Sequence, residues 1–378
     1  MMDQRTGVGL VGTGFMGKCH ALAFQAVRAT FPDTLRVRLR RLVDVDPAVT
    51  EAFARAFDFE RWSTRFEDLI EDPDVLIVAI TTPNFLHQEM ALAAMAVGKH
   101  VYCEKPLALD AAGARTMAEA AERAGVKTLV GYNYLRSPAV GLAREVIRSG
   151  GIGDVIHFRG AHFEDFLADP AAPRTWRLTR ATAGGGALGD MGSHVVSLAR
   201  HLVGGIEEVM GATQTVIAER PDPREPGRRL PVDVDDQAQA LLRFENGASG
   251  TLETSWLAQG RKMGLTFEIT GTRGAILFDQ ERMNEIRLFQ GGGPRRLHGF
   301  KTILMGPDHP HYACFCPAPG HGLGFNDLKT IEVKALLDGI RDGTPIDPDF
   351  RAGLEIAQVI EAIQLSAAEG RWVRPDAL

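Results

Sequence analysis

The sequence predicts an α/β protein of two domains: an N-terminal domain on a parallel sheet, and a C-terminal α+β domain with a large, mostly antiparallel open sheet. Three observations support this fold class. First, 378 residues are many for one hydrophobic core. Second, short apolar runs alternate with helical patterns as far as Gly131, which is typical of a parallel sheet. Third, strand patterns then follow one another, so we divide the chain into residues 1–131 and 132–378.

The composition is that of an ordinary globular protein, with 45% hydrophobic residues, 24% charged residues and a net charge of −6. Nucleic-acid binding would need a basic surface, so we expect no nucleic-acid partner. No apolar run is long enough to cross a bilayer, and residues 1–7 lack the apolar core of a signal peptide. We therefore expect no membrane partner and a cytoplasmic location. The low number of cysteines, 4, agrees with a reducing compartment.

The first elements are a strand, a glycine turn and a helix. Gly12, Gly14 and Gly17 have the G-x-G-x-x-G spacing directly after the buried strand 8–11. In this motif the first glycine makes a tight turn, the second lets the backbone approach a pyrophosphate, and the third brings the helix close to the strand. The N-terminus of the helix then favours phosphate groups. We therefore expect a Rossmann dinucleotide-binding domain. The turn residues expected to contact the dinucleotide are Gly12, Thr13, Gly14, Phe15, Met16 and Gly17.

A second apolar run ends at Asp44, whose carboxylate can accept hydrogen bonds from a ribose 2′-hydroxyl. Its separation from Gly17 is longer than usual, and a turn around Pro32 accounts for the surplus. No Arg or Lys follows Asp44 to hold a 2′-phosphate, so the sequence favours NAD over NADP. The alternative is a turn aspartate in a domain that binds no nucleotide.

The remaining patterns complete both domains. In the first we expect strands over 76–80, 100–103 and 127–130, and helices over 84–97 and from Asp110 to Gly125. In the second we expect a helix over 139–148, strands over 238–244, 252–256, 265–270 and 275–278, and two C-terminal helices. We interpret 221–231 as a solvated excursion and 291–324 as a long segment with little periodicity that lies over an active site. Helices can cover one sheet face and leave the other as a subunit interface, which predicts a homo-oligomer, a dimer or a tetramer.

Two groups of residues could carry out proton chemistry. Lys105, in Glu104-Lys105-Pro106, directly follows a strand, so it is placed at the ligand-binding edge and can stabilise a developing negative charge. The Lys105–Pro106 bond is a candidate cis peptide. Asp190 and His194 are four residues apart and share one face of a helix, whose N-terminal dipole favours a neutral imidazole. The alternatives are an ordinary surface lysine, a helix-capping aspartate and a hydrogen-bonded surface histidine.

With these motifs in view, the sequence resembles the Gfo/Idh/MocA oxidoreductases over nearly its whole length. The motifs are 12–17, Thr82-Pro83-Asn84 with His87, 104–106, and the spacing of Asp190 and His194. The resemblance implies that Lys105, Asp190 and His194 are catalytic. It also implies that a set of polar residues lines the dinucleotide. These residues are Thr82, Asn84, His87, Glu104, Lys105 and Asn133.

Within this family the sequence is most similar to sugar and cyclitol dehydrogenases of the levoglucosan and scyllo-inositol type. Further segments support the similarity: 132–136, 175–177, 232–236, 271–274 and 306–310. By this analogy, substrate hydroxyls would contact polar side chains that could equally be surface residues. These residues are Lys105, Glu164, Asp165, Arg177, Asp190, His194 and His321.

These motifs lead to a mechanistic hypothesis. An NAD-dependent dehydrogenase would oxidise a secondary ring hydroxyl of a cyclitol, such as scyllo- or myo-inositol, or of a sugar, such as L-glucose or levoglucosan. His194 would take the hydroxyl proton, Lys105 would stabilise the oxygen, and Asp190 would orient His194 or hold a neighbouring hydroxyl. The hypothesis requires Lys105 and His194 to converge beside the nicotinamide C4.

Three alternatives remain open. A NAD-dependent glycoside hydrolase and a dinucleotide-sensing regulator could use the same fold. A metalloenzyme could use the borderline ligands of the 309–321 segment, although their C-x-C spacing matches no common zinc site, and we assign no metal. Those ligands are His309, His311, Cys314, Cys316 and His321.

Overall fold

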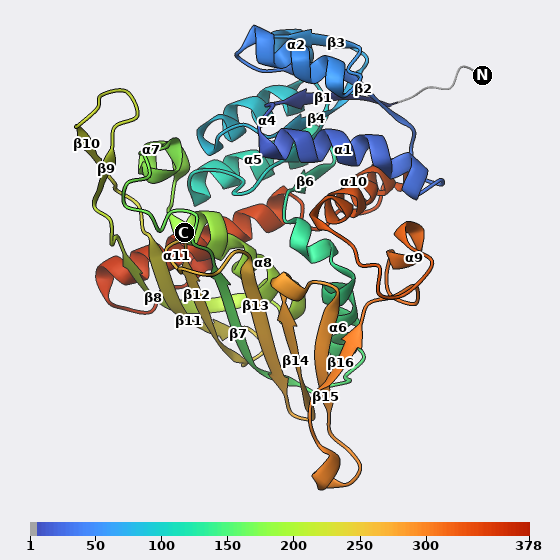
Figure 1. The fold of residues 1–378 in the computed structure, drawn as a ribbon, viewed down its shortest axis with the longest axis vertical. Helices are drawn as coiled ribbons and strands as arrows, with labels where there is room; N and C mark the ends of the chain where they lie inside the picture. Colours follow the sequence, from blue (N-terminus) through green and yellow to red (C-terminus); the bar gives the residue numbers. More distant parts are fainter. Residues whose placement is uncertain (1–5) are drawn as a thin grey trace. The chain divides into compact units, whose positions relative to one another are not determined.

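The computed structural model describes residues 6–378, which form two compact units (Figure 1). The first unit comprises residues 6–108, 112–136 and 324–354, and the second comprises 109–111, 137–323 and 355–378. The chain thus returns to the first unit near its end, a return that the linear division at residue 131 does not contain. Residues 1–5, where we expect no signal peptide, lie outside the described range. Within residues 6–378, no helix has both the length and the apolar character to span a membrane.

The first unit is built on a six-stranded parallel sheet with strand order β3-β2-β1-β4-β5-β6. The strands are β1 (Thr6–Val11), β2 (Val37–Val43), β3 (Arg61–Ser63), β4 (Val75–Ile80), β5 (His100–Cys103) and β6 (Thr128–Val130). The helices are α1 (Phe15–Thr30), α2 (Pro47–Ala56), α3 (Phe66–Ile70), α4 (His87–Ala96), α5 (Ala111–Ala124) and α10 (Phe325–Asp342), with short helices η1 (Asn84–Leu86) and η2 (Asn133–Arg136). The apolar β1 and β4 are buried at the centre of the sheet. The predicted Rossmann-type sheet is confirmed, and its carboxyl ends share one edge.

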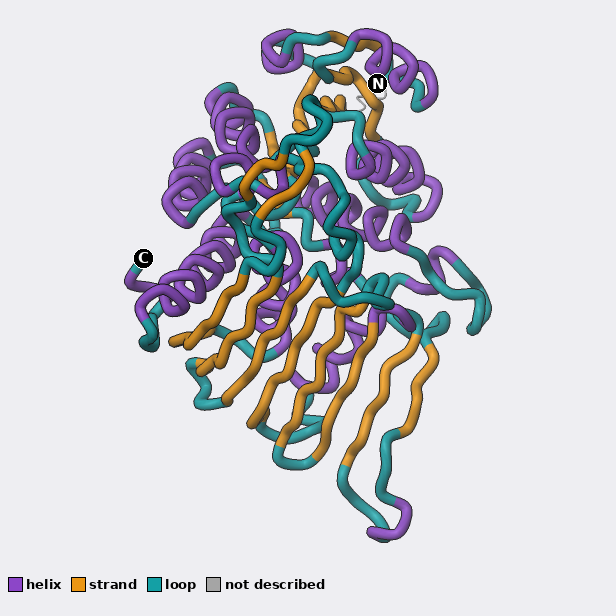
Figure 2. Tube along the Cα trace, turned by 60° about the vertical axis from the view of Figure 1, so that its left-hand side comes forward, coloured by secondary structure: helices purple, strands orange, loops and turns teal. Residues whose placement is uncertain are grey.

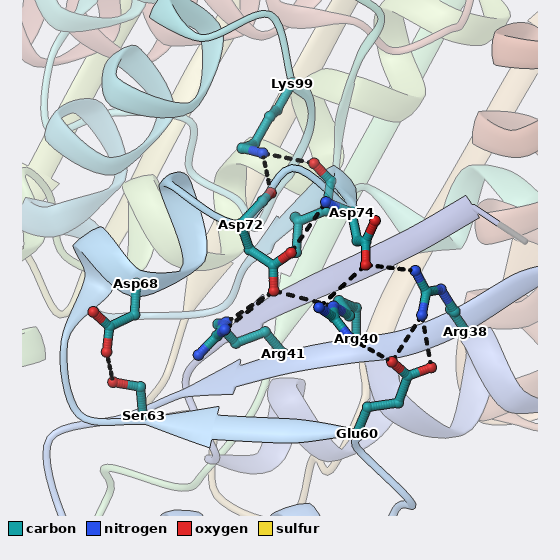
Figure 3. A network of polar contacts seen from close by, with 10 residues as sticks. Arg38, Arg40, Arg41, Glu60, Ser63, Asp68, Asp72, Asp74 and Lys99 are labelled. Carbon is teal, nitrogen blue, oxygen red and sulfur yellow. Dashed lines mark hydrogen bonds and ion pairs between the residues drawn. The ribbon is translucent and has the colours of Figure 1, made fainter.

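Ion pairs hold the strand that ends just before Asp44 (Figure 3). The register between β1 and β2 skips Arg40, so the consecutive residues Arg40 and Arg41 both reach the Asp72 carboxylate, at 3.1 Å. Burial alone would raise the pKa of Asp72, but hydrogen bonds from a backbone N–H and from both arginines hold the pKa below its ordinary value. Lys99 caps the same corner by donating to the Asp72 carbonyl oxygen at 2.9 Å.

The second unit contains an eight-stranded sheet with strand order β16-β15-β14-β13-β7-β12-β11-β8. Its strands are β7 (Val155–Phe163), β8 (Ile206–Gln214), β11 (Gln237–Phe244), β12 (Ser249–Ser255), β13 (Gly264–Gly271), β14 (Gly274–Asp279), β15 (Glu285–Gln290) and β16 (Lys301–Leu304). Every neighbouring pair is antiparallel except β7 and β12. This confirms the mostly antiparallel open sheet. Figure 2 shows its strands side by side with helices behind them.

Helices pack on the apolar face of this sheet. Buried and partly exposed residues alternate along β7 and β13, so each strand has one covered face and one open face. The helices of the unit are α6 (Pro138–Arg148), α7 (Arg180–Ala183), η3 (Trp176–Leu178), the π-helical turn η4 (Leu188–Gly192), α8 (Ser193–Leu202), η5 (Gln280–Arg282), η6 (Arg295–Leu297), α9 (Tyr312–Phe315) and η7 (Pro375–Ala377). α11 (Phe350–Glu369) begins in the first unit and continues in the second.

Two expected loops contain regular structure. The segment 221–231 is bounded by a two-stranded ribbon of β9 (Glu219–Pro221) and β10 (Arg229–Pro231), and Arg220, within β9, is fully buried. Residues 223–229 are exposed, so this part of the segment is a solvated excursion as expected, although β9 and β10 pair at its base. The segment 291–324 contains the edge strand β16 and the short helix α9. The Gly and Pro residues of the segment suggest a loop, and both elements are only four residues long, too short to show a periodic pattern.

Candidate functional site

The glycine turn of the first unit is built by two close backbone approaches. Gly12 has φ +101°, a conformation that disfavours side chains, and a Cβ at Gly17 would lie 2.1 Å from the Gly12 carbonyl oxygen. α1 therefore begins tightly against β1. Gly14 precedes α1 without a side-chain cap, and a Cβ there would meet no atom within 4 Å. This open space beside unpaired N–H groups fits the pyrophosphate of a dinucleotide.

Asp44 lies at the end of β2, next to this turn. Its Oδ2 accepts hydrogen bonds from the Thr13 backbone N–H at 2.7 Å and from the Thr13 hydroxyl at 2.6 Å. Its Oδ1 accepts the Val45 N–H at 2.6 Å. The carboxylate is thus held beside the turn but stays partly exposed, as a ribose-binding group must be. Val45, which follows it, is 87% exposed.

The loops after β4 and β6 carry further expected cofactor residues. Asn133 is buried in η2, and its Nδ2 has no hydrogen-bond partner among residues 6–378. Such a buried donor fits a polar group of a bound ligand. His87 is fully buried, with ring nitrogens 2.9 Å from the carbonyl oxygens of Thr82 and Pro106, and burial lowers its pKa. His87 therefore links two loops, and the expectation that it, Thr82 and Asn84 line a dinucleotide stays a prediction.

Glu104-Lys105-Pro106 follows β5 at the same edge of the sheet. The Lys105–Pro106 peptide is cis, as predicted. Lys105 is partly exposed, whereas Glu104 is buried and accepts hydrogen bonds from His20 Nε2 at 2.7 Å and Lys329 Nζ at 2.6 Å. Burial alone would raise the pKa of Glu104, but the Lys329 ammonium and the His20 hydrogen bond hold that pKa far below its ordinary value. Sequence reasoning missed both partners, which are distant in the chain.

In the second unit, η4, which carries Asp190, runs directly into α8, which carries His194. The buried Asp235 carboxylate fixes the start of η4 by accepting the backbone N–H groups of Gly186 at 3.0 Å and Leu188 at 2.7 Å. A Cβ at Gly186 would lie 1.8 Å from the Asp235 carbonyl oxygen, so this approach requires glycine. The expected helix is confirmed, with a π-turn at its beginning.

Five polar residues gather around this helix start. Arg177 Nε lies 3.8 Å from Asp190 Oδ2. The His162 ring, on β7, meets the His194 ring edge-on at a centroid distance of 5.7 Å. His162 Nε2 lies 3.0 Å from Glu164 Oε1. The structure thus brings together Arg177, Asp190, His194 and Glu164, as expected, and adds His162. A histidine in an alternating strand pattern gives no signal from which this role could be found.

A small apolar cluster and a buried arginine anchor the segment that carries Arg177. The cluster comprises Leu167, Leu178, Ala187, Met191, Val232, Val234 and Trp256. It joins both ends of the segment to η4, because Leu167 and Leu178 flank the segment and Met191 lies in η4. Arg220 donates to the carbonyl oxygens of Leu167 at 2.6 Å and Asp169 at 2.7 Å. The position of Arg177 is therefore fixed by packing as well as by charge.

Other expected residues lie elsewhere in the second unit. Asp165 Oδ2 is 2.6 Å from Lys262 Nζ and accepts the Gly260 N–H at 3.0 Å. His321 is exposed and has no hydrogen-bond or ion-pair partner within residues 6–378. Among these described residues, no three His, Cys, Asp or Glu side chains are placed to hold a metal ion. Lys105 belongs to the first unit and Asp190 and His194 to the second, so their convergence stays a prediction.

Comparison with known proteins matches two family models to the chain. Residues 6–132 match the oxidoreductase family with an NAD-binding Rossmann fold, and residues 140–277 match the GFO/IDH/MocA C-terminal domain. Levoglucosan dehydrogenase of Pseudarthrobacter phenanthrenivorans is 38% identical over 98% of each chain. The NAD⁺-dependent scyllo-inositol 2-dehydrogenase of Bacillus subtilis is 27% identical over 82% of this chain and 81% of its own.

Solved structures give the same result. A structure of levoglucosan dehydrogenase in complex with NADH and levoglucosan has a TM-score of 0.94 and 40% sequence identity, and the match covers 98% of this chain and 99% of that one. An NAD-binding oxidoreductase from Klebsiella pneumoniae has a TM-score of 0.94 and 42% identity, with the same coverage.

The buried histidines predict a dependence of stability on pH. Burial lowers the pKa of His20 and His87, so both stay neutral in the folded protein while the unfolded chain takes up protons near pH 6.5. Stability therefore falls as the pH drops below that value. We expect His87→Gln to reduce the slope of unfolding free energy against pH by up to about 1.4 kcal/mol per pH unit, measured in urea between pH 7 and 5. His321→Gln, an exposed control, should keep the wild-type slope, and an unchanged slope in His87→Gln would contradict the prediction.

Proposed function

This chain belongs to the GFO/IDH/MocA family and is an NAD-dependent sugar or cyclitol dehydrogenase, and we propose that it oxidises a secondary ring hydroxyl of a pyranose such as levoglucosan. The observation that carries this substrate proposal is the 38% identity to a levoglucosan dehydrogenase over 98% of both chains. Cyclitols such as scyllo-inositol are the next substrates to test, since a NAD⁺-dependent scyllo-inositol 2-dehydrogenase is also a relative.

The residues that would hold the dinucleotide lie in the first unit. The N–H groups at the start of α1 would bind the pyrophosphate, and the Asp44 carboxylate would accept hydrogen bonds from a ribose. Asn133 Nδ2 supplies a buried donor that has no partner within residues 6–378. Bound NAD supplies the acceptor for the hydride that leaves the substrate carbon.

The proton chemistry falls to three side chains in this proposal. A ring nitrogen of His194 takes the hydroxyl proton, which requires a neutral imidazole. The Lys105 ammonium stabilises the negative charge that develops on the substrate oxygen. Asp190 orients the substrate or His194, and its carboxylate lies 3.8 Å from Arg177 Nε. The hydroxyl loses its proton to His194, the carbon that bears it loses a hydride to NAD, and a ketone forms.

We also propose a cytoplasmic homo-oligomer, a dimer or a homotetramer. The support is the open face of the eight-stranded sheet, where Leu241 is 50% exposed, together with four cysteines that are all free. Light scattering at micromolar concentration should find a mass above that of one chain. A monomer under these conditions would contradict the assembly but not the activity.

Coenzyme preference should depend on Asp44 and on Val45, which follows it. The wild type should use NAD far better than NADP, because the carboxylate repels a 2′-phosphate. Asp44→Ser combined with Val45→Arg should raise the KM for NAD by roughly 10–100-fold, since charged hydrogen bonds are lost, and should lower the KM for NADP. Initial rates at 340 nm measure both constants. Val216→Arg adds the same charge at an exposed site of the second unit and should change neither; equal use of both coenzymes by the wild type would refute the assignment of Asp44.

Loss of either proton-handling group should lower turnover with little effect on coenzyme binding. We expect Lys105→Ala and His194→Ala each to reduce kcat by about 10²–10⁴-fold, while NADH fluorescence titrations give nearly wild-type affinity. Lys301→Ala and His157→Ala, changes at surface positions of the second unit, are the matched controls and should keep wild-type kcat.

The substrate panel for this experiment contains levoglucosan, L-glucose, myo-inositol and scyllo-inositol. Wild-type kcat in either site variant would show that the roles are misassigned. NADH formation separates the proposed reaction from its rivals. Release of an aglycone from a glycoside without net NADH would identify a hydrolase, and NAD binding without turnover of any compound would indicate a regulator.

A further inference from the structure

A fully buried lysine lies beneath the turn that carries Lys105. Lys329, on α10, is 0% exposed, and its ammonium group has three acceptors. They are Glu104 Oε1 at 2.6 Å, Glu332 Oε2 at 2.9 Å and Tyr102 Oη at 3.1 Å. Because an ammonium has three N–H donors, this set satisfies it completely. Burial alone would lower the pKa of Lys329, but the two carboxylates hold the pKa above its ordinary value, so the residue stays charged.

The Glu104 carboxylate has a second donor from another helix. His20, on α1, is also fully buried and stacks on the Tyr102 ring at a centroid distance of 4.2 Å. Burial lowers the pKa of His20, so its ring is neutral, and Nε2–H donates to Glu104 at 2.7 Å. The other nitrogen, Nδ1, has no partner within residues 6–378, which agrees with the neutral tautomer. Two helices from opposite ends of the chain therefore hold one carboxylate.

The residue directly after β6 is Gly131, and the absence of a side chain at this position leaves room for the Glu104 carboxylate. A Cβ at Gly131 would lie 2.8–2.9 Å from the carboxylate atoms of Glu104. Such a distance is below ordinary contact, so the glycine fixes where the carboxylate can lie. Position and charge of Glu104 are thus set separately, by Gly131 and by Lys329.

These contacts bear on the neighbouring residue in the chain. Glu104 precedes Lys105, and the Pro106 carbonyl oxygen that follows is 2.9 Å from a ring nitrogen of His87. The backbone is therefore held on both sides of Lys105. We propose that Lys329 is a positioning residue for catalysis, which acts through Glu104 to hold the turn that presents Lys105. This inference rests on the proposed dehydrogenase function and adds a residue that lies 224 positions farther along the chain.

Removal of Lys329 should leave Glu104 as a buried anion without its cation. The carboxylate then takes up a proton or attracts the Lys105 ammonium, and either change moves the turn. We expect Lys329→Met to lower kcat by about 10–100-fold, the size of effect that a misplacement of about 1 Å produces. The KM for NAD and the affinity for NADH should stay within about threefold of wild type, because the glycine turn is untouched.

A rescue experiment separates charge from packing. Glu104→Gln in the Lys329→Met background removes the uncompensated charge, and we expect kcat to rise about tenfold above that of Lys329→Met alone. A double-mutant cycle with the single variants then gives a coupling between the two residues. If the double variant is no more active than Lys329→Met, the electrostatic link is wrong.

Two lysines provide matched controls. Lys99 is another buried lysine of the first unit, and it donates to the carbonyl oxygens of Asp72 and Val75 (Figure 3). Lys334 is on the same helix as Lys329 and pairs with Asp338. Lys99→Met and Lys334→Met should keep wild-type kcat. A loss in Lys99→Met equal to that in Lys329→Met would show that the effect is general destabilisation, and would overturn the proposal.

A second variant covers the case in which Lys329→Met does not fold. Gly131→Ala keeps every charge but places a methyl group against the Glu104 carboxylate. We expect it to lower kcat by about 10–100-fold as well, since the same turn is displaced. A folded Gly131→Ala enzyme with wild-type kcat would overturn the proposal.

An additional measurement does not need turnover. Reductive methylation with ¹³C-formaldehyde labels the lysines, and the NMR signal of Lys105 is identified by its loss in Lys105→Ala. This signal should shift in Lys329→Met and stay unchanged in Lys99→Met. If the wild type oxidises no compound of the panel, the proposed function fails while the signal still tests the network. If the Lys105 signal does not move in Lys329→Met, the positioning role fails whatever the activity.

Discussion

The close approach of α1 to β1 is the constraint on which the first unit depends. A Cβ at position 17 would lie only 2.1 Å from the Gly12 carbonyl oxygen, so the helix can begin here only with a glycine at that position. This contact sets the phosphate-binding end of α1, and it also sets where the next turn of the helix places His20. The His20 ring then reaches Glu104 beyond β5. One steric requirement therefore positions both the expected dinucleotide turn and a partner of the residue next to Lys105.

Local pattern was enough to predict the parts of the fold that local physics determines. The glycine spacing, the strand before it and the polar residues after β2 and β5 all follow from short-range rules, and each is found where expected. The cis bond at Pro106 and the helix with Asp190 and His194 are of the same kind. The regular structure within 291–324 escaped prediction because its elements are too short to show a period.

The partners of these residues could not be predicted, because they come from distant segments. Lys329 belongs to one of the two expected C-terminal helices, and only the fold brings it to Glu104. His162 lies on β7 and Arg220 on β9, two strands that the sequence did not predict, and their partners also come from distant parts of the chain. Sequence spacing can identify which residues carry chemistry, whereas the groups that orient them are set by tertiary contacts.

The hydrogen bonds around Glu104 orient this residue more than they stabilise the fold. Burying an ammonium and two carboxylates costs solvation that their attraction only partly recovers, so apolar residues of similar volume would often serve stability as well. Apolar packing, however, would let the turn settle in several positions, because it has no directional requirement. The Lys329 ammonium donates three hydrogen bonds at once, and Tyr102, Glu104 and Glu332 accept them in one arrangement. The directional hydrogen bonds thus favour a single conformation for Glu104, the residue directly before Lys105.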